Sequence, residues 1–261
     1  MTKPAIHEEI IQLLISTKEI FQSFSINDLK SIAGREAPPE TNADKQVATY
    51  LAIGLSKIVP GHNIIVEDGE PIFGNSEEAT WVIDPIDGTI PFMYHIPSYM
   101  VSIYALKNNV IQSAFAYNPN NGDVFYSDGK FSYCNDVAMK VSTKDSLVEA
   151  RIALSVHAIE TLPNLFSSLR EAGAYIILQE GLVFRSLLVA NGYIDATIQV
   201  GLKQFESGAV HSLVTNAGGQ VRSSTQDNVE FLSTSPYVVI SNSNLNSKIA
   251  LILKGIVEKK S

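Results

Sequence analysis

The sequence predicts an α+β protein in which helices pack against β-sheets. Apolar side chains recur at helical spacing near the N-terminus, short apolar runs alternate with turn residues in the middle, and strand-like and helix-like segments alternate after about residue 145. The 261 residues, 45% of them apolar, can bury a substantial core. No repeat or flexible linker stands out, so we predict one compact unit over residues 1–261, with an N-terminal half at 1–145 and a C-terminal half at 146–261.

Two helices are predicted before the first strand. Residues 6–24 carry an amphipathic helical pattern. A second helix begins at Thr41 or Asn42, both favourable N-cap residues, and ends before Pro60. The segment between these helices reads as a polar loop.

Strands follow in the rest of the N-terminal half. Residues 63–66 and 80–83 are short β-branched runs, and each is followed by an acidic residue, so we expect strands that deliver carboxylates from their C-terminal ends. Between residues 99 and 126, apolar runs are separated by asparagine-rich turns, which predicts antiparallel strands.

The C-terminal half is predicted to alternate strands and helices, several of which end at glycine. The predicted elements are a strand at 175–178, a helix at 182–190 ended by Gly192, a strand at 194–200, a helix from about 205 ended by Gly218 and Gly219, a strand at 237–240 and a helix at 245–257.

Composition narrows the classes of function that the chain can have. The formal charge is −8 and no lysine-rich or arginine-rich block is present, which disfavours nucleic-acid binding. Acidic residues interrupt the first apolar stretch and no run reaches the length of a membrane span, so we expect a cytoplasmic protein with no membrane partner. The single cysteine, Cys134, is interpreted as a packing residue.

The segment WVIDPIDGT at residues 81–89 carries the strongest chemical signal. A strand that ends in Asp84, turns at the next proline and presents Asp87 three residues later can point two carboxylates at one spot. Gly88 lets the backbone approach a ligand, and Thr89 is placed to cap a helix whose free amides could hold a phosphate. The pattern therefore favours a site for hard cations and an anion.

An ordinary acidic turn is the alternative interpretation, because Asp-Pro and Asp-Gly are common turn dipeptides. Two further acidic positions favour the metal site: the pair Glu67-Asp68 ends the preceding strand, and Asp44 lies in the first turn of the second helix. Carboxylates about 4 Å apart repel by roughly 4 kcal/mol per pair at an effective dielectric near 20, so such a group needs divalent cations to stay ionised.

Five segments carry a wider pattern: the motif at 84–89, the acidic pair at 67–68, the segment at 42–44, the stretch QVGLKQFESGA at 199–209 and the segment AGG at 217–219. Together they resemble the inositol monophosphatase-like family of lithium-sensitive, Mg²⁺-dependent phosphatases. The resemblance implies a layered α-β-α-β-α sandwich of the inositol monophosphatase/fructose-1,6-bisphosphatase type. It also implies two or three Mg²⁺ ions and a homodimer, since relatives often form one.

Site residues follow from the same resemblance. The metal ligands would be Glu67, Asp84, the carbonyl of Ile86, Asp87 and Glu206. The catalytic residues would be Asp44, Glu67 and Thr89, which orient a metal-activated water. The substrate and phosphate contacts would be Asp87, Gly88, Thr89, Gln199, Lys203 and Glu206.

Two of these site residues depart from the family pattern, and the role of a third is open. Glu206 stands where the family has aspartate and is longer by one methylene, which bears on the near-ideal octahedral geometry that Mg²⁺ requires. Gln199 replaces a glutamate that contacts a sugar hydroxyl in inositol-preferring members. Lys203 is a candidate contact for a second anionic group, and a solvated surface lysine is the alternative.

The expected function is Mg²⁺-dependent hydrolysis of a small phosphate monoester, with inositol monophosphate or a related sugar phosphate as the favoured substrate and no covalent intermediate. The spacing of Asp84 and Asp87 argues against a phosphoaspartate enzyme, which needs two aspartates separated by one residue. The alternatives are a 3'(2'),5'-bisphosphate nucleotidase, a fructose-1,6-bisphosphatase and, from another class, a non-catalytic homologue that binds metal or phosphate.

Overall fold

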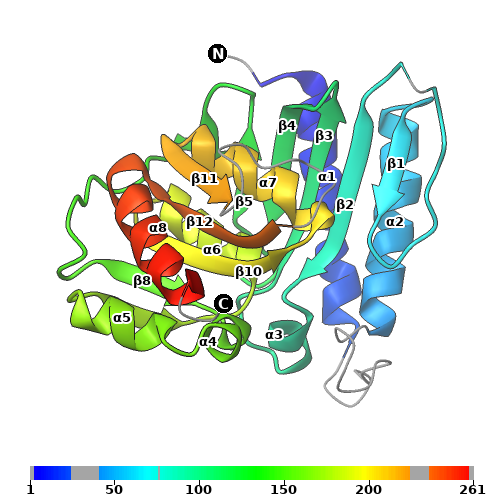
Figure 1. Cartoon of the computed structure of the whole chain (residues 1–261). Coiled ribbons are helices and arrows are strands. Elements are labelled where there is room, and N and C mark those ends of the chain that lie inside the picture. Colours follow the sequence, from blue (N-terminus) through cyan, green and yellow to red (C-terminus); the bar gives the residue numbers. More distant parts are fainter. Residues whose placement is uncertain (1–2, 25–40, 76, 224–234, 259–261) are drawn as a thin grey trace.

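Two β-sheets organise the chain in a computed structural model that describes residues 3–24, 41–75, 77–223 and 235–258 (Figure 1). The seven-stranded sheet has the order β1-β2-β3-β4-β5-β6-β7, and the five-stranded sheet has the order β11-β12-β10-β8-β9. The strands of the large sheet are β1 Asn63–Val66, β2 Thr80–Asp87, β3 Met100–Lys107, β4 Val110–Tyr117, β5 Val124–Ser127, β6 Ser132–Cys134 and β7 Val137–Ala138. Those of the small sheet are β8 Arg151–Leu154, β9 Tyr175–Leu178, β10 Ala196–Leu202, β11 Gly219–Ser223 and β12 Ser235–Asn242.

The helices lie on both sides of these sheets. They are α1 Ala5–Gln22, α2 Asn42–Ile58, α3 Thr89–Met93, α4 Val156–Thr161, α5 Leu165–Glu171, α6 Leu182–Ala190, α7 Gln204–Thr215 and α8 Ser243–Glu258. Figure 1 shows α1 and α2 on the outer face of the large sheet, α6 and α7 between the sheets, and α4, α5 and α8 beyond the small sheet.

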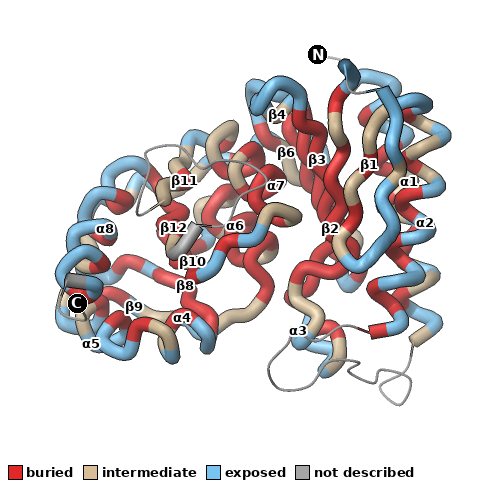
Figure 2. Tube along the Cα trace, turned by 45° about the vertical axis from the view of Figure 1, so that its right-hand side comes forward, coloured by how far each residue is buried: buried red, intermediate tan, exposed pale blue. Residues whose placement is uncertain are grey.

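Three hydrophobic cores hold these layers together. Along β2, Trp81 and Ile83 join the core under α1 and α2, whereas Val82 joins the core that α6 and α7 share with both sheets. The third core packs α4, α5 and α8 on the far face of the small sheet. Successive strand residues point to opposite faces, so both faces of β2 are buried (Figure 2). The predicted α-β-α-β-α layering is confirmed.

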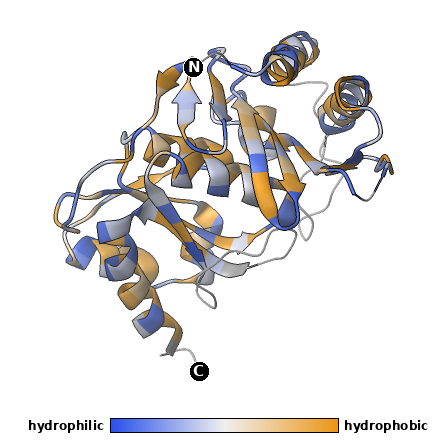
Figure 3. Ribbon diagram, turned by 90° about the horizontal axis from the view of Figure 1, so that it is seen from above, coloured by the Kyte–Doolittle hydropathy of each residue, from blue (hydrophilic) through white to orange (hydrophobic). Residues whose placement is uncertain are grey.

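The N-terminal helices agree with their sequence pattern. Thr41 is the N-cap of α2, its hydroxyl accepts the amide of Ala43, and its own amide donates to Asp44. Figure 3 looks down on Figure 1 and shows α1 and α2 nearly end-on, with hydrophobic and hydrophilic residues on different sides. The polar loop predicted between them lies outside the described residues.

The central motif differs from the prediction. The expected turn at Pro85 is wrong, because β2 continues to Asp87 and its pairing with β3 shifts register between Asp84 and Asp87. Such an irregularity tolerates a proline that cannot donate to the ladder. The predicted N-cap at Thr89 is wrong by one residue, because Gly88 is the N-cap of α3 and Thr89 is the first helical residue.

Short elements were missed, namely β6, β7, β8, β11, α4 and α5. Contacts join residues on both sides of the predicted 145/146 division: Tyr104 Oη donates to the Gln204 carbonyl at 2.8 Å, and Asn216 Nδ2 donates to Ser127 Oγ at 2.6 Å. The division into two halves stays a prediction. Within the described ranges, no helix has both the length and the apolar character needed to cross a membrane.

Candidate functional site

Three carboxylates that are far apart in the sequence meet at one point. Glu67 follows β1, Asp84 lies in β2, and Glu206 lies in the first turn of α7. One oxygen from each lies within 4.8 Å of the other two. These three residues are called the acid cluster below. Asp84 and Glu206 are buried and Glu67 is partly buried, so water cannot fully screen their repulsion.

The electrostatics of the acid cluster favour a bound cation. Burial raises the pKa of Glu206 to about 8, with Asp87 and Glu67 adding repulsion. Burial and the neighbouring acids also raise the pKa of Asp84 well above its usual value, and burial raises that of Glu67. A donor set made of carboxylate oxygens suits hard cations such as Mg²⁺ or Ca²⁺. The residues present therefore fit a divalent metal.

The bulge in β2 orients two of the predicted ligands. Asp84 Oδ1 accepts the amide of Ile86 at 3.1 Å, which fixes the carboxylate against its own backbone. The Ile86 carbonyl oxygen lies 3.3 Å from Thr89 Oγ1. A carbonyl has two lone pairs, so this contact leaves one for another ligand.

Glu206 is held at the start of α7. Its Oε1 accepts the amide of Lys203 at 3.2 Å. Tyr104 anchors the same turn through the Gln204 carbonyl and packs so closely on Gly208 that a Cβ there would collide with the tyrosine ring. The longer glutamate thus reaches the acid cluster while it also caps its own helix.

Asp87 lies beside the acid cluster but outside it. Its Oδ1 accepts the amide of Leu182 at 3.0 Å and its Oδ2 accepts the amide of Val183 at 2.8 Å. Burial raises its pKa to about 6, against the lowering effect of the amides and of Arg185. Asp87 therefore caps α6, a contact that the sequence analysis missed, and its role as a metal ligand stays a prediction.

The predicted pair of Thr89 and Asp44 is brought together. Thr89 Oγ1 lies 3.4 Å from Asp44 Oδ1, while Asp44 Oδ2 accepts the amide and the hydroxyl of Thr41 at 2.7 and 2.6 Å. Burial raises the pKa of Asp44 to about 6, with the Thr41 hydrogen bonds opposing the rise. The Thr89 hydroxyl is therefore within reach of two acceptors, Asp44 and the Ile86 carbonyl.

Gln199 contacts a buried cation that the sequence analysis did not identify. Arg185 in α6 is 1% exposed, and its Nη2 donates to Gln199 Oε1 at 2.6 Å. Its Nη1 donates to the Gln179 carbonyl at 2.9 Å. The sequence feature that could have indicated it is an arginine within a helix of mostly apolar residues. The guanidinium fixes the amide of Gln199, whose role toward a substrate stays a prediction.

The side chain of Lys203 is exposed, and its ammonium forms an ion pair with Glu67. Its Nζ lies 3.1 Å from Glu67 Oε1, at the edge of the acid cluster. Although burial lowers the pKa of the ammonium, the carboxylates of Glu67, Glu206 and Asp84 together raise it above its ordinary value. Its predicted contact with an anionic group of the substrate stays untested by this geometry.

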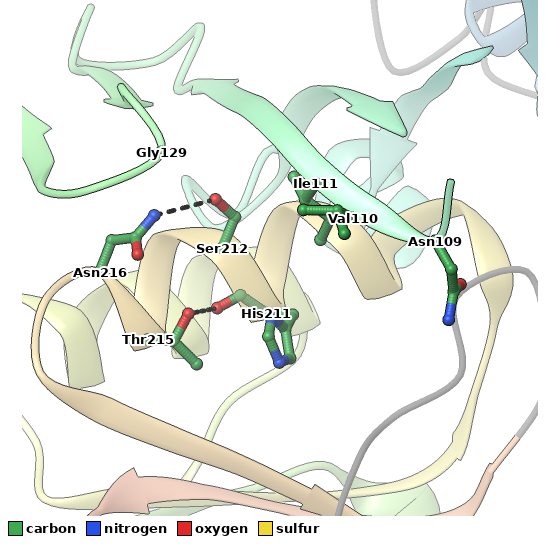
Figure 4. Close-up of a pocket in the computed structure, with 8 residues that line it drawn as sticks. All are labelled: Asn109, Val110, Ile111, Gly129, His211, Ser212, Thr215 and Asn216. Atoms are coloured by element: carbon green, nitrogen blue, oxygen red, sulfur yellow. Dashed lines mark hydrogen bonds between the residues drawn. The ribbon is translucent and has the colours of Figure 1, made fainter. Parts of the chain in front are cut away.

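A separate pocket of about 230 Å³ lies where α7 faces the β3–β4 turn (Figure 4). It is lined by Asn109, Val110, Ile111, Gly129, His211, Ser212, Thr215 and Asn216. None of these eight is a predicted site residue, and burial lowers the pKa of His211, which favours its neutral form. The pocket lacks the charged groups that a phosphate ester requires.

Comparison with known proteins agrees with the geometry. Residues 6–258 match the sequence model of the inositol monophosphatase family. The Nus factor SuhB of Pseudomonas aeruginosa is 30% identical over 224 residues, which cover 82% of each chain. The inositol-1-monophosphatase of Mesorhizobium japonicum is 27% identical over 187 residues, 69% of this chain and 70% of that protein.

The fold is shared with a solved structure that contains metal and phosphate. An IMPase/NADP phosphatase complexed with Mg²⁺ and phosphate superposes with a TM-score of 0.82 at 19% identity, covering 95% of this chain and 94% of that one. At this identity the likeness concerns the fold alone.

Proposed function

Because the chain belongs to the inositol monophosphatase family, we propose that it is a Mg²⁺-dependent hydrolase of small phosphate monoesters, acting without a covalent intermediate. Inositol monophosphate or a related sugar phosphate is the favoured substrate. The observation that carries this proposal is the convergence of Glu67, Asp84 and Glu206 beside the Thr89–Asp44 pair.

The chain offers a coherent set of ligands for the metal. Glu67, Asp84, Glu206, the Ile86 carbonyl and Asp87, whose carboxylate the α6 amides orient, would hold Mg²⁺. When bound, Mg²⁺ would lower the pKa of the attacking water and neutralise the phosphoryl oxygens. The positive charge would also relieve the repulsion within the acid cluster.

Thr89 and Asp44 would position the attacking water. If the Thr89 hydroxyl donates to Asp44, its oxygen is free to accept a hydrogen bond from the water. Asp44, with a pKa near 6, is mostly ionised at neutral pH and can accept that bond. The amides of Gly88 and Thr89, at the start of α3, would hold the phosphate.

The test is phosphate release from a substrate panel with Mg²⁺ or with EDTA. The panel contains inositol monophosphate, a 3'-phosphoadenosine nucleotide and fructose 1,6-bisphosphate. We expect Mg²⁺-dependent turnover that Asp84→Asn abolishes, because the central carboxylate of the cluster loses its charge. Asp145→Asn removes an equal charge from an exposed position outside the acid cluster and is the matched control. Equal release by the wild type and Asp84→Asn would contradict the proposal.

A non-catalytic homologue is the second candidate, and three observations favour it. Glu206 is longer than the family's aspartate, and Lys203 already pairs with Glu67 in the acid cluster. The relative from Pseudomonas aeruginosa is named for a Nus factor rather than for a phosphatase. Tight binding of Mg²⁺ and phosphate without turnover of any ester in the panel would favour this candidate. The homodimer and the absence of nucleic-acid binding stay predictions.

A further inference from the structure

Lys203 brings a positive charge to the edge of the acid cluster. Its Nζ lies 3.1 Å from Glu67 Oε1, and the Lys203 side chain keeps 47% of its surface exposed while that of Glu67 keeps 18%. The same residue donates its backbone amide to Glu206 Oε1 at 3.2 Å. The start of α7 therefore delivers both a carboxylate and an ammonium to one point.

The backbone limits how far the ammonium can move away. Lys203 is the N-cap of α7, and the next residue, Gln204, is tied to β3 by the Tyr104 hydroxyl at 2.8 Å. The Cα of Lys203 is thereby fixed relative to the large sheet. Only rotation of the lysine side chain can take its charge away from Glu67.

The Lys203 ammonium and a divalent cation compete for Glu67. Both are attracted by Glu67, and they repel one another when they lie close together. The ammonium changes the formal charge of the group from −3, for the three carboxylates alone, to −2. It therefore weakens the electrostatic attraction of the acid cluster for any added cation.

We propose that Lys203 is a built-in counter-cation of the acid cluster that competes with divalent metal for Glu67. This inference rests on the metal binding in the proposed function and deepens it. The ammonium stabilises the acid cluster when little metal is available and sets the Mg²⁺ concentration at which the site fills. Lys203 thus acts on metal occupancy rather than by contact with the phosphate ester.

The experiment measures Mg²⁺ binding to the EDTA-stripped, full-length protein by titration calorimetry. Lys203→Met removes the charge and keeps most of the length, and Lys57→Met removes an equal charge from the far end of α2. We expect Lys203→Met to bind Mg²⁺ about fivefold more tightly, the size typical of a partly exposed ion pair. We also expect it to melt at a lower temperature in EDTA. Lys57→Met should match the wild type in both measurements.

Lys203→Gln serves as a second neutral variant if the methionine variant does not fold, as judged by circular dichroism. Equal or weaker Mg²⁺ binding by the neutral variants would overturn this inference alone, and a raised KM at unchanged Mg²⁺ affinity would assign Lys203 to the substrate instead. Absence of Mg²⁺ binding to both the wild type and the variants would overturn the proposed function as well.

Discussion

At the residue scale, Glu206 makes the stability of the fold depend on pH, because it is a buried acid that lies beside other acidic side chains. Its pKa rises from 4.5 in a free side chain to about 8 in the folded, metal-free protein. Between these values the folded state holds a proton that the unfolded state has released. The contribution of protonated Glu206 to the free energy of unfolding is therefore complete below about pH 4.5 and is lost as the pH rises towards 8.

A neutral side chain at this position should flatten that dependence. In EDTA, we expect the free energy of unfolding of the wild type to fall by roughly 2–4 kcal/mol more than that of Glu206→Gln between pH 5 and pH 8. Glutamine can still accept the Lys203 amide, so the helix cap is kept. Urea unfolding at several pH values checks this, and parallel curves for the two proteins would contradict it.

The Thr89 hydroxyl provides a second residue-level prediction. Thr89→Ala removes the group that lies between Asp44 and the Ile86 carbonyl, so we expect kcat to fall by about 10²- to 10³-fold. Thr89→Ser keeps the hydroxyl and should retain most of the activity. Calorimetry should show that both variants still bind Mg²⁺, because Thr89 lies outside the acid cluster.

The sequence predicted some of these contacts and not others, for a physical reason. Glu67 and Asp84 were expected to converge because each is an acid at a strand end, and Glu206 was added by the resemblance to the family. The three side chains do meet. The bond from Asp87 to α6 was missed because its partners are backbone amides, which carry no side-chain signal. Arg185 was missed because its burial depends on tertiary packing.

At the element scale, two glycines with nearly equal φ angles allow a comparison. Gly181 before α6 has φ +81° and Gly122 in the β4–β5 turn has φ +83°. A Cβ at Gly181 would collide with the Ser98 carbonyl and lie 3.4 Å from Asp87 Oδ2, whereas nothing lies within 4 Å at Gly122. Only the first substitution adds a steric clash to the conformational cost.

We therefore expect Gly122→Ala to cost about 1 kcal/mol of unfolding free energy and Gly181→Ala at least about 2 kcal/mol more. Gly181→Ala should also reduce turnover, because the displaced α6 amides hold Asp87. Urea denaturation of both variants measures the difference. Similar costs at the two positions would show that the Ser98 backbone yields easily.

Elements with strong caps were predicted best. The capping box at Thr41 and the glycine after α6 mark their boundaries in the sequence, and the structure agrees. Elements of two to seven residues, such as β7 and α5, carry too few residues to show a period and depend on neighbours for their shape. The extension of β2 past Pro85 likewise depends on its pairing with β3.

At the scale of the whole molecule, the site is assembled from both predicted halves. Glu67 and Asp84 come from the large sheet, whereas Glu206 and Lys203 come from the helix packed between the sheets. Asp87 and α6 make a second connection. Any ligand that bridges the acid cluster therefore also joins the two halves, so site occupancy and global stability should change together.

Mg²⁺ should accordingly stabilise the folded chain against heat. At a free concentration of 100 times Kd, binding to the native state alone adds about 2.7 kcal/mol, which corresponds to a rise in Tm of roughly 5–10 °C for a chain of this size. Differential scanning calorimetry of the wild type should show one transition that moves as a unit, because the bridging carboxylates belong to both halves. Asp84→Asn should lose most of the shift, since the remaining two carboxylates bind the ion weakly. An equal shift in Asp84→Asn would place the stabilising ion elsewhere, and two separate transitions would show that the halves unfold independently.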